Sequence, residues 1–194
     1  MKDTRAKART LRTLGLVLAG LSAVGALAGC SARPDEPVEL LSILDSPEDP
    51  ENDPMPDFGT GSVSLPDGGE IEVSRFVGET EAGRYWVASD SEQRLCAFAY
   101  QKDAKGLAST CSPMHRFEMS GLWISGMGSY DDEQGVQRTQ RTEIFVAPDG
   151  YTPVEIPEGL EQIQPNVLAG DRTGEERPIT FRSEETGREI EFPG

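Results

Sequence analysis

The stretch Ile71-Glu72-Val73-Ser74-Arg75-Phe76-Val77 largely alternates between apolar and polar side chains. This is the pattern of a β-strand with one buried face. Residues 85–88 and 95–100 are also strand-like, because aromatic and apolar side chains dominate them. The same character returns in four later segments, residues 121–125, 143–146, 179–182 and 189–192.

Turn-forming residues separate these segments, as in Asp67-Gly68-Gly69 and Pro148-Asp149-Gly150. Helical periodicity is weak and confined to residues 157–163. Short strands between regular turns predict a mainly β domain, an antiparallel sandwich or a barrel-like fold.

The charge of the chain is divided unevenly. Residues 1–29 carry five basic side chains and one acid, a net charge of +4, and the whole chain carries −16, so residues 30–194 carry −20. Nucleic acid is polyanionic and is bound through clustered Lys and Arg. The acidic remainder therefore excludes nucleic-acid binding, and it disfavours docking on anionic lipid.

The basic start is followed by an uncharged run from Leu14 to Gly29, sixteen residues long. A membrane-spanning helix needs about 20 apolar residues, so this shorter run is typical of a cleavable signal peptide over residues 1–29. The four residues Leu27-Ala28-Gly29-Cys30 resemble the lipobox of bacterial lipoproteins. The resemblance implies cleavage before Cys30, a diacylglyceryl group on its sulfur, and anchoring at the extracytoplasmic face of the cell membrane.

Residues 31–57 follow the anchor and contain nine acidic residues, six prolines and one basic residue. Such a composition cannot form a core, so we expect residues 30–57 to be a disordered tether before a single domain over residues 58–194. The apolar patch from Val38 to Leu44 is an exception, and it either docks on a partner or folds back on its own domain. Asp49, Glu51 and Asp53 alternate as at the start of a calcium loop, but prolines interrupt the pattern, which indicates solvated charge.

Two cysteines remain in the exported part, Cys96 and Cys111. An even number of thiols in an oxidising compartment predicts a disulfide, which would cross a hairpin whose tip is residues 102–106. The alternative is a thiol-based or redox function, which no Cys-x-x-Cys spacing supports.

The order of motifs over residues 85–167 resembles small secreted or lipidated actinobacterial proteins. These have a strand that ends in Cys, a second Cys after a turn, and a later Pro-Asp-Gly turn. The resemblance covers about half of the domain and implies no activity. Its residues are Tyr85-Trp86-Val87, Leu95-Cys96, Cys111, Phe117, Gly121-Leu122, Pro148-Asp149-Gly150 and Pro165-Asn166-Val167.

The sequence contains one histidine, His115, so any nucleophile activated by a histidine must use it. Met114, His115, Met119 and Met127 could together hold Cu(I), or these methionines could fill gaps in the core beside Phe117 and Trp123. Acidic residues are too abundant to single out a catalytic pair. No motif for a cofactor or a strong metal site occurs.

These observations favour a lipid-anchored envelope protein whose domain is a non-enzymatic binding module for a protein or glycan partner. The alternative is an envelope enzyme that uses carboxylates or His115. A concave pocket with convergent, perturbed acids would favour the enzyme, and a flat exposed aromatic patch would favour the binding module.

Overall fold

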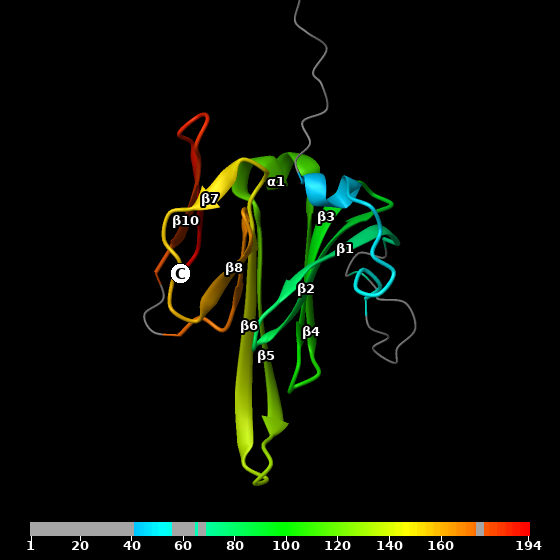
Figure 1. Ribbon diagram of the computed structural model, residues 1–194, viewed down its shortest axis with the longest axis vertical. Coiled ribbons are helices and arrows are strands. Elements are labelled where there is room, and N and C mark those ends of the chain that lie inside the picture. The colour runs from blue at the N-terminus through cyan, green and yellow to red at the C-terminus, as the bar shows by residue number, and fades with distance from the viewer. Residues whose placement is uncertain (1–40, 56–64, 66–68, 174–176) are drawn as a thin grey trace, which may run out of the picture. The chain divides into compact units, whose positions relative to one another are not determined.

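The computed structural model describes residues 41–55, 65, 69–173 and 177–194 (Figure 1). The described residues form three antiparallel sheets and no closed barrel. The predicted mainly β, antiparallel fold is therefore confirmed. The signal-peptide segment and Cys30 lie outside the described residues.

The first sheet, sheet A, is a four-stranded meander in the order β1-β2-β3-β4. Its strands are joined by short turns, and each pairs with the next strand along the chain. They are β1 (Ile71–Glu79), β2 (Gly83–Asp90), β3 (Arg94–Gln101) and β4 (Leu107–Pro113).

The second sheet, sheet B, has the order β5-β6-β9-β8. The hairpin of β5 and β6 is the longest in the molecule and keeps its register without a shift from Leu122↔Val146 to Asp131↔Gln137. The strands are β5 (Leu122–Asp131), β6 (Gln137–Val146), β8 (Leu160–Gln164) and β9 (Val167–Gly170).

The third sheet, sheet C, is smaller and has the order β11-β10-β7. Two short helices complete the described part, η1 (Ser42–Asp45) before sheet A and α1 (Met114–Ser120) between β4 and β5. None of the described helices is long and apolar enough to span a membrane. The strands of sheet C are β7 (Tyr151–Pro153), β10 (Ile179–Ser183) and β11 (Glu189–Phe192).

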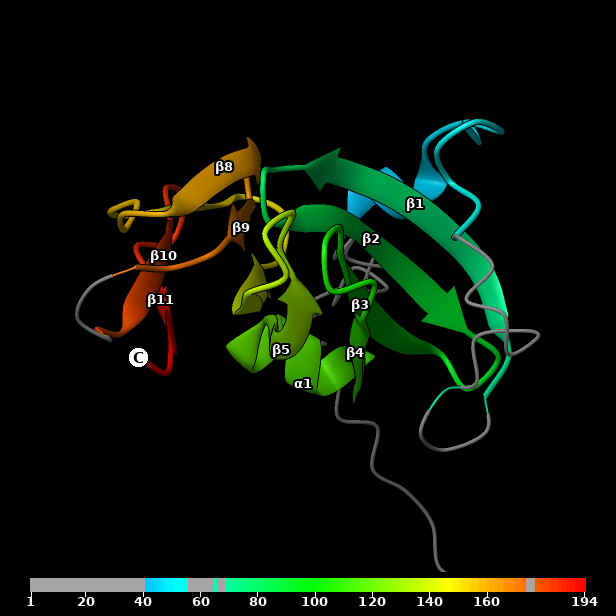
Figure 2. The same cartoon turned by 90° about the horizontal axis from the view of Figure 1, so that it is seen from below.

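Sheet B lies between the other two sheets (Figure 2). In β6, Ile144 and Val146 point into a core shared with sheet A, whereas Phe145 points into a core shared with sheet C. In β9, Val167 faces sheet A and Leu168 faces sheet C. Successive side chains of a strand point to opposite faces, so an uninterrupted apolar run is what a strand between two cores requires.

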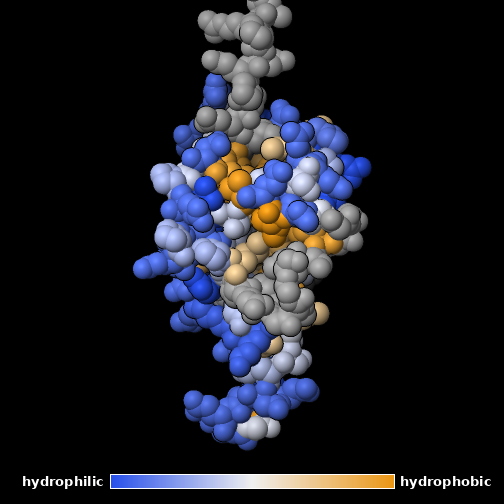
Figure 3. Space-filling model, turned by 90° about the vertical axis from the view of Figure 1, so that its right-hand side faces the viewer, coloured by the Kyte–Doolittle hydropathy of each residue, from blue (hydrophilic) through white to orange (hydrophobic). Residues whose placement is uncertain are grey.

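A third cluster covers the outer face of sheet A, where Trp86 and Phe98 are fully buried. Leu65 and Met55, from the segment that precedes β1, pack against these rings. Figure 3 shows this side of the molecule, where apolar residues gather in the middle of a hydrophilic surface. Within the described residues, both faces of sheet A therefore carry apolar contacts.

Sheets A and B approach closely because β5 contains Gly126 and Gly128. A Cβ on Gly126 would lie 2.7 Å from the Cβ of Ala108 in β4, and a Cβ on Gly128 would collide with Gln101. Glycine within a strand marks such a close approach. Gln101 uses this space to donate a hydrogen bond to the Gln140 carbonyl oxygen over 3.1 Å, which fixes the tip of one hairpin to the other.

All seven segments expected as strands are strands in the structure. The weak helical prediction for residues 157–163 is wrong, because they contain a turn and the start of β8. β4 corresponds to the second arm of the hairpin expected around residues 102–106, whereas β7, β8, β9 and the helix α1 were not predicted from the sequence.

The contact between Gly126 and Ala108 gives a first prediction. Gly126→Ala should destabilise the domain by about 1–3 kcal/mol, because the added methyl overpacks the interface between the sheets. In an Ala108→Gly background the same substitution should cost less, because the opposing methyl is gone. Urea unfolding of the four proteins measures this coupling, and equal costs in both backgrounds would show that the two positions do not limit the approach.

Candidate functional site

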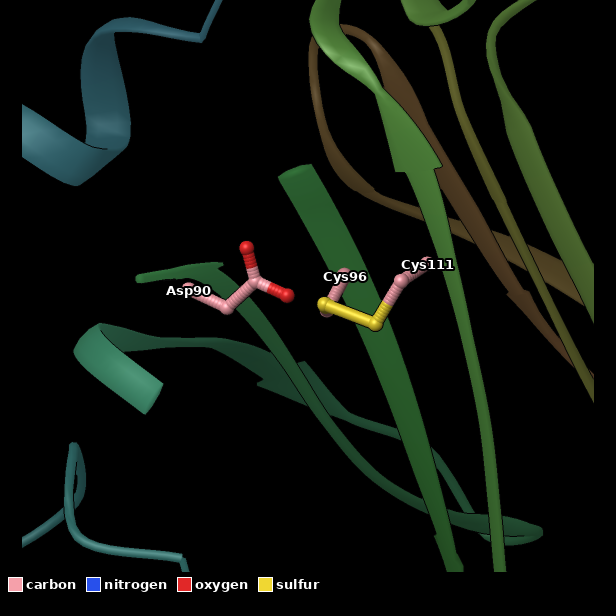
Figure 4. Close-up of side chains that lie close together, drawn as sticks. All are labelled: Asp90, Cys96 and Cys111. Carbon is pink, nitrogen blue, oxygen red and sulfur yellow. A yellow bond between two sulfur atoms is a disulfide. The ribbon is translucent and has the colours of Figure 1, made fainter. Parts of the chain in front are cut away.

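The predicted disulfide joins Cys96 in β3 to Cys111 in β4 (Figure 4). These residues are direct partners in the register of the two strands, with Cα atoms 4.0 Å apart. The hairpin between them turns at residues 102–106, as expected. The pairing of the strands therefore brings the two sulfur atoms together, and the disulfide prediction is confirmed.

Asp90 lies beside this disulfide, and its carboxylate and the two sulfur atoms all lie within 4.8 Å of one another. The group is not a metal site in this state, because each sulfur is bonded to the other. The Asp90 carboxylate also accepts hydrogen bonds from Arg94, over 2.9 Å from the amide and 2.7 Å from Nε. The ion pair joins β2 to β3, and the disulfide joins β3 to β4.

Burial disfavours ionisation of Asp90, but its hydrogen bonds outweigh that effect. The amides of Arg94 and Glu92 and the Arg94 guanidinium together hold the pKa of the Asp90 carboxyl below its ordinary value. Asp90 is therefore an ionised structural group at neutral pH.

The residues considered for copper do not form one site. Met114, His115 and Met119 lie exposed on α1, whereas Met127 lies on β5 and is 77% exposed. Met127 is five residues beyond the start of β5, about 17 Å along the strand. The core-packing alternative is also wrong for these methionines, although Phe117 is fully buried and Trp123 packs against the second core.

The segment before β1 is folded onto the domain from residue 41 to residue 55. Leu41 is buried, and Ile43 and Leu44 pack against the core between sheets A and B. The prediction of a disordered tether up to residue 57 is therefore wrong for residues 41–55, whereas residues 30–40 lie outside the described residues. For Leu41 to Leu44, the alternative in which the patch folds back on its own domain is confirmed.

Asp53 holds this segment in place. Its carboxylate accepts hydrogen bonds from the amide of Phe76 over 2.8 Å and from the amide of Asp49 over 2.6 Å, and it lies 3.7 Å from Arg75. The interpretation of Asp53 as solvated charge is wrong, since its side chain is only 6% exposed. Because β1 is an edge strand, Asp53 also occupies a backbone donor that would otherwise be open to another strand.

The adjacent Asn52 extends this attachment across the outer face of sheet A. Its backbone carbonyl oxygen accepts a hydrogen bond from the indole of Trp86 over 2.9 Å. Its side-chain oxygen accepts a longer hydrogen bond, of 3.3 Å, from Arg84. We call residues 41–55 the N-terminal strap, since they cross from the first core to this outer face.

Three carboxylates, Glu81, Glu161 and Asp171, line a pocket of about 380 Å³ near the ends of β1 and β8. Burial raises the pKa of Asp171. The positive charge of Arg141 lowers this pKa and the negative charge of Glu143 raises it, and the net shift is upward. In this pocket, two further acids therefore lie around a carboxyl with a raised pKa. The sequence offers no signal that would distinguish these three acids from the others.

Beneath this region, Glu143 in β6 is completely buried and carries two arginine partners. Arg172 donates to it over 3.1 Å and Arg141 over 2.8 Å. The Arg172 guanidinium also lies over the ring of Phe145, 5.7 Å from its centroid. A buried acid with this many partners is satisfied, so Glu143 attaches the segment after β9 to sheet B.

No protein-family model, curated protein or solved structure matches the chain.

The hydrogen bonds of Asp53 predict that the strap contributes to stability. Asp53→Ala should destabilise the domain by about 2–4 kcal/mol, because it leaves the Phe76 amide and Arg75 without this partner. Glu51→Ala, at an exposed position two residues earlier, should change stability by less than about 0.5 kcal/mol. Urea unfolding measures both, and similar values for the two variants would rule out a structural role for Asp53.

The lowered pKa of Asp90 predicts a dependence on pH. An acid whose pKa is lower in the folded state stabilises the fold above its unfolded value, near pH 4, and this contribution is lost as the pH falls toward the folded value. Asp90→Asn should therefore be less stable than the wild type near pH 7, and the difference should shrink toward about pH 2.

Unfolding by urea at a series of pH values measures this difference. Asp45→Asn, at an exposed carboxyl, serves as the control and should follow the wild type throughout. A deficit in Asp90→Asn that does not change with pH would contradict the electrostatic explanation.

Proposed function

We propose that this protein is an exported lipoprotein, anchored to the membrane through Cys30, whose domain is a binding module of the cell envelope. The lipobox-like Leu27-Ala28-Gly29-Cys30 supports the anchor. The disulfide between Cys96 and Cys111 fits an oxidising compartment. Two acyl chains on one cysteine would suffice for stable attachment.

The folded strap limits how far the domain can move from such an anchor. Only residues 31–40 separate Cys30 from the docked Leu41. Their fully extended length is about 35 Å, less than half of the length that a free tether up to residue 57 would allow. The proposed module therefore acts close to the membrane surface.

The outer face of sheet C is the observation that carries the binding function. Within the described residues, apolar clusters cover both faces of sheet A and of the central part of sheet B, whereas this face presents polar side chains to solvent. None of its described residues is aromatic, so the aromatic patch that would favour a binding module is not found on this face, and its polar side chains suit a polar partner such as a protein surface or a glycan. Its residues are Thr152, Thr180, Arg182, Glu189 and Glu191.

Photo-crosslinking in the native envelope tests this face. A photoreactive residue at position 182 should give a discrete adduct with a partner, and the same probe at Glu133, on the tip of the β5–β6 hairpin, should not. Equal labelling from both positions would show that sheet C is not the binding face.

A second candidate function is a hydrolase that uses the acidic pocket, and the raised pKa of Asp171 favours it. A carboxyl whose pKa is raised by burial, with further carboxyl groups nearby, is a feature of enzymes that cleave glycosidic bonds. If so, the purified protein should hydrolyse envelope polysaccharide, and Asp171→Asn should remove the activity while keeping the fold. An inactive wild-type protein, or a fully active variant, would exclude this function.

The anchor gives its own prediction. Cys30→Ala should move the protein from the membrane fraction to the soluble exported or unprocessed fraction, because the acceptor for the lipid is lost. Fractionation followed by mass spectrometry of the mature N-terminus measures this. Ser31→Ala is the control and should stay in the membrane. An intact residue 1–29 segment on the mature membrane-bound protein would contradict the proposal.

A further inference from the structure

An apolar groove of about 530 Å³ opens at the edge of the core between sheets A and B. Its floor is formed by Val77 of β1, Val87 of β2 and Val167 of β9, which all belong to that core. Leu41 and Ile43 of the strap also line it. These three valines are themselves only 1–2% exposed, so the groove presents the edge of a packed core to a chain that passes over it.

The strap enters the domain along the rim of this groove. The Ser42 amide donates a hydrogen bond to the Asp149 carboxylate over 2.6 Å, and Asp149 also accepts a hydrogen bond from Asn166. These two contacts fix the direction of the chain at the groove, since Ser42, Asp149 and Asn166 all line it.

The residues immediately before Leu41 have the composition that the groove requires. Val38 and Leu40 are apolar, and they continue the patch whose later members, Leu41 and Ile43, already contact the core. Residues 31–37 consist of Ser, Ala, Arg, Pro, Asp, Glu and Pro and offer no large apolar side chain. The apolar character therefore begins at Val38.

We propose that the groove is the docking site of the chain's own residues Val38 and Leu40. Val38 is three residues from Leu41, so its Cα lies within about 10 Å of a residue that lines the groove. A tethered segment at this distance has an effective concentration of about millimolar or higher at the groove. A free ligand of similar affinity would need a similar concentration to compete with it. Burial of two aliphatic side chains favours the docked state.

Docking of Val38 extends the strap to residues 38–55 and leaves residues 31–37 as the free part of the tether, about 25 Å when extended. The proposal goes beyond the proposed function and does not depend on it, because it concerns contacts within the domain whether or not Cys30 carries a lipid.

Disulfide trapping in the full exported chain tests the proposal. Leu40→Cys is combined with Pro165→Cys, an exposed position on the groove, and the control combines Pro34→Cys with Pro165→Cys. A disulfide requires Cα atoms about 4.4–6.8 Å apart. The first pair should form an intramolecular bond, identified by peptide mapping, at least about tenfold faster than the control pair.

Equal rates for the two pairs would overturn the proposal and leave the groove open to an external ligand. A bond between two copies would overturn it too, in favour of a second copy as the occupant.

A second measurement uses no added cysteine. Val38→Asp with Leu40→Asp should speed amide hydrogen exchange at residues 41–46 by at least about tenfold, while exchange in β6 stays unchanged. Glu39→Gln, between the two positions, should leave both regions as in the wild type. Unchanged exchange at residues 41–46 in the double variant would also overturn the proposal.

Discussion

Burial of sheet B on both faces is the constraint on which the rest of this structure depends. Phe145 packs against Phe192 of sheet C, with ring centroids 5.5 Å apart, while its neighbours Ile144 and Val146 are completely buried against sheet A. A strand with apolar side chains on both faces is stable only when both are covered. Sheets A and C are therefore each needed to shield the same central strands.

This arrangement explains why the polar side chains of Glu143 and Tyr85, which are buried between the sheets, have partners. Glu143 shares β6 with these apolar residues and has two arginine partners, and the Tyr85 hydroxyl hydrogen-bonds to both Thr80 and Thr142 between sheets A and B. Burial raises the pKa of Tyr85, so the phenol remains neutral and serves as a hydrogen-bonding group. A buried polar group without a partner would cost more than the bond itself contributes.

The strap covers part of the edge of β1, which is an outermost strand of sheet A. Edge strands invite pairing with other chains unless they are blocked. Asp53 occupies the Phe76 amide, and Arg75 donates to the Ser46 carbonyl oxygen, so the segment that leads toward the proposed anchor also protects this edge. The same residues would thereby hold the domain near the membrane and limit its association with other chains.

The strands with aromatic or alternating residues could be predicted from the sequence because their pattern reflects a buried face. Ser109, Thr110 and Ser112 give β4 a polar composition, so it could be expected only as the second arm of the hairpin crossed by the disulfide, although it pairs with β3 along its whole length. The strap was predicted to be part of the disordered tether because prolines and acids dominate the composition of residues 31–57. A composition taken over the whole segment gives little weight to the few apolar residues, such as Leu41 and Ile43, that dock on the domain.

The disulfide and the three aspartates discussed above also differ in whether they could be predicted from the sequence. The disulfide followed from the number of cysteines and the expected compartment, which needs no three-dimensional information. Asp53, Asp90 and Asp171 could not be singled out among 34 acidic residues, because only the fold places each beside its partners.

Native-state hydrogen exchange along β6 tests whether sheet B is buried on both faces. Residues 142–146 lie between two cores, whereas residues 137–139 of the same strand are exposed in the β5–β6 hairpin. We expect the hydrogen-bonded amides of residues 142–146 to exchange only through global unfolding, and the amides of residues 137–139 to exchange by local opening, orders of magnitude faster. Uniform exchange along the whole of β6 would contradict a sheet buried on both faces.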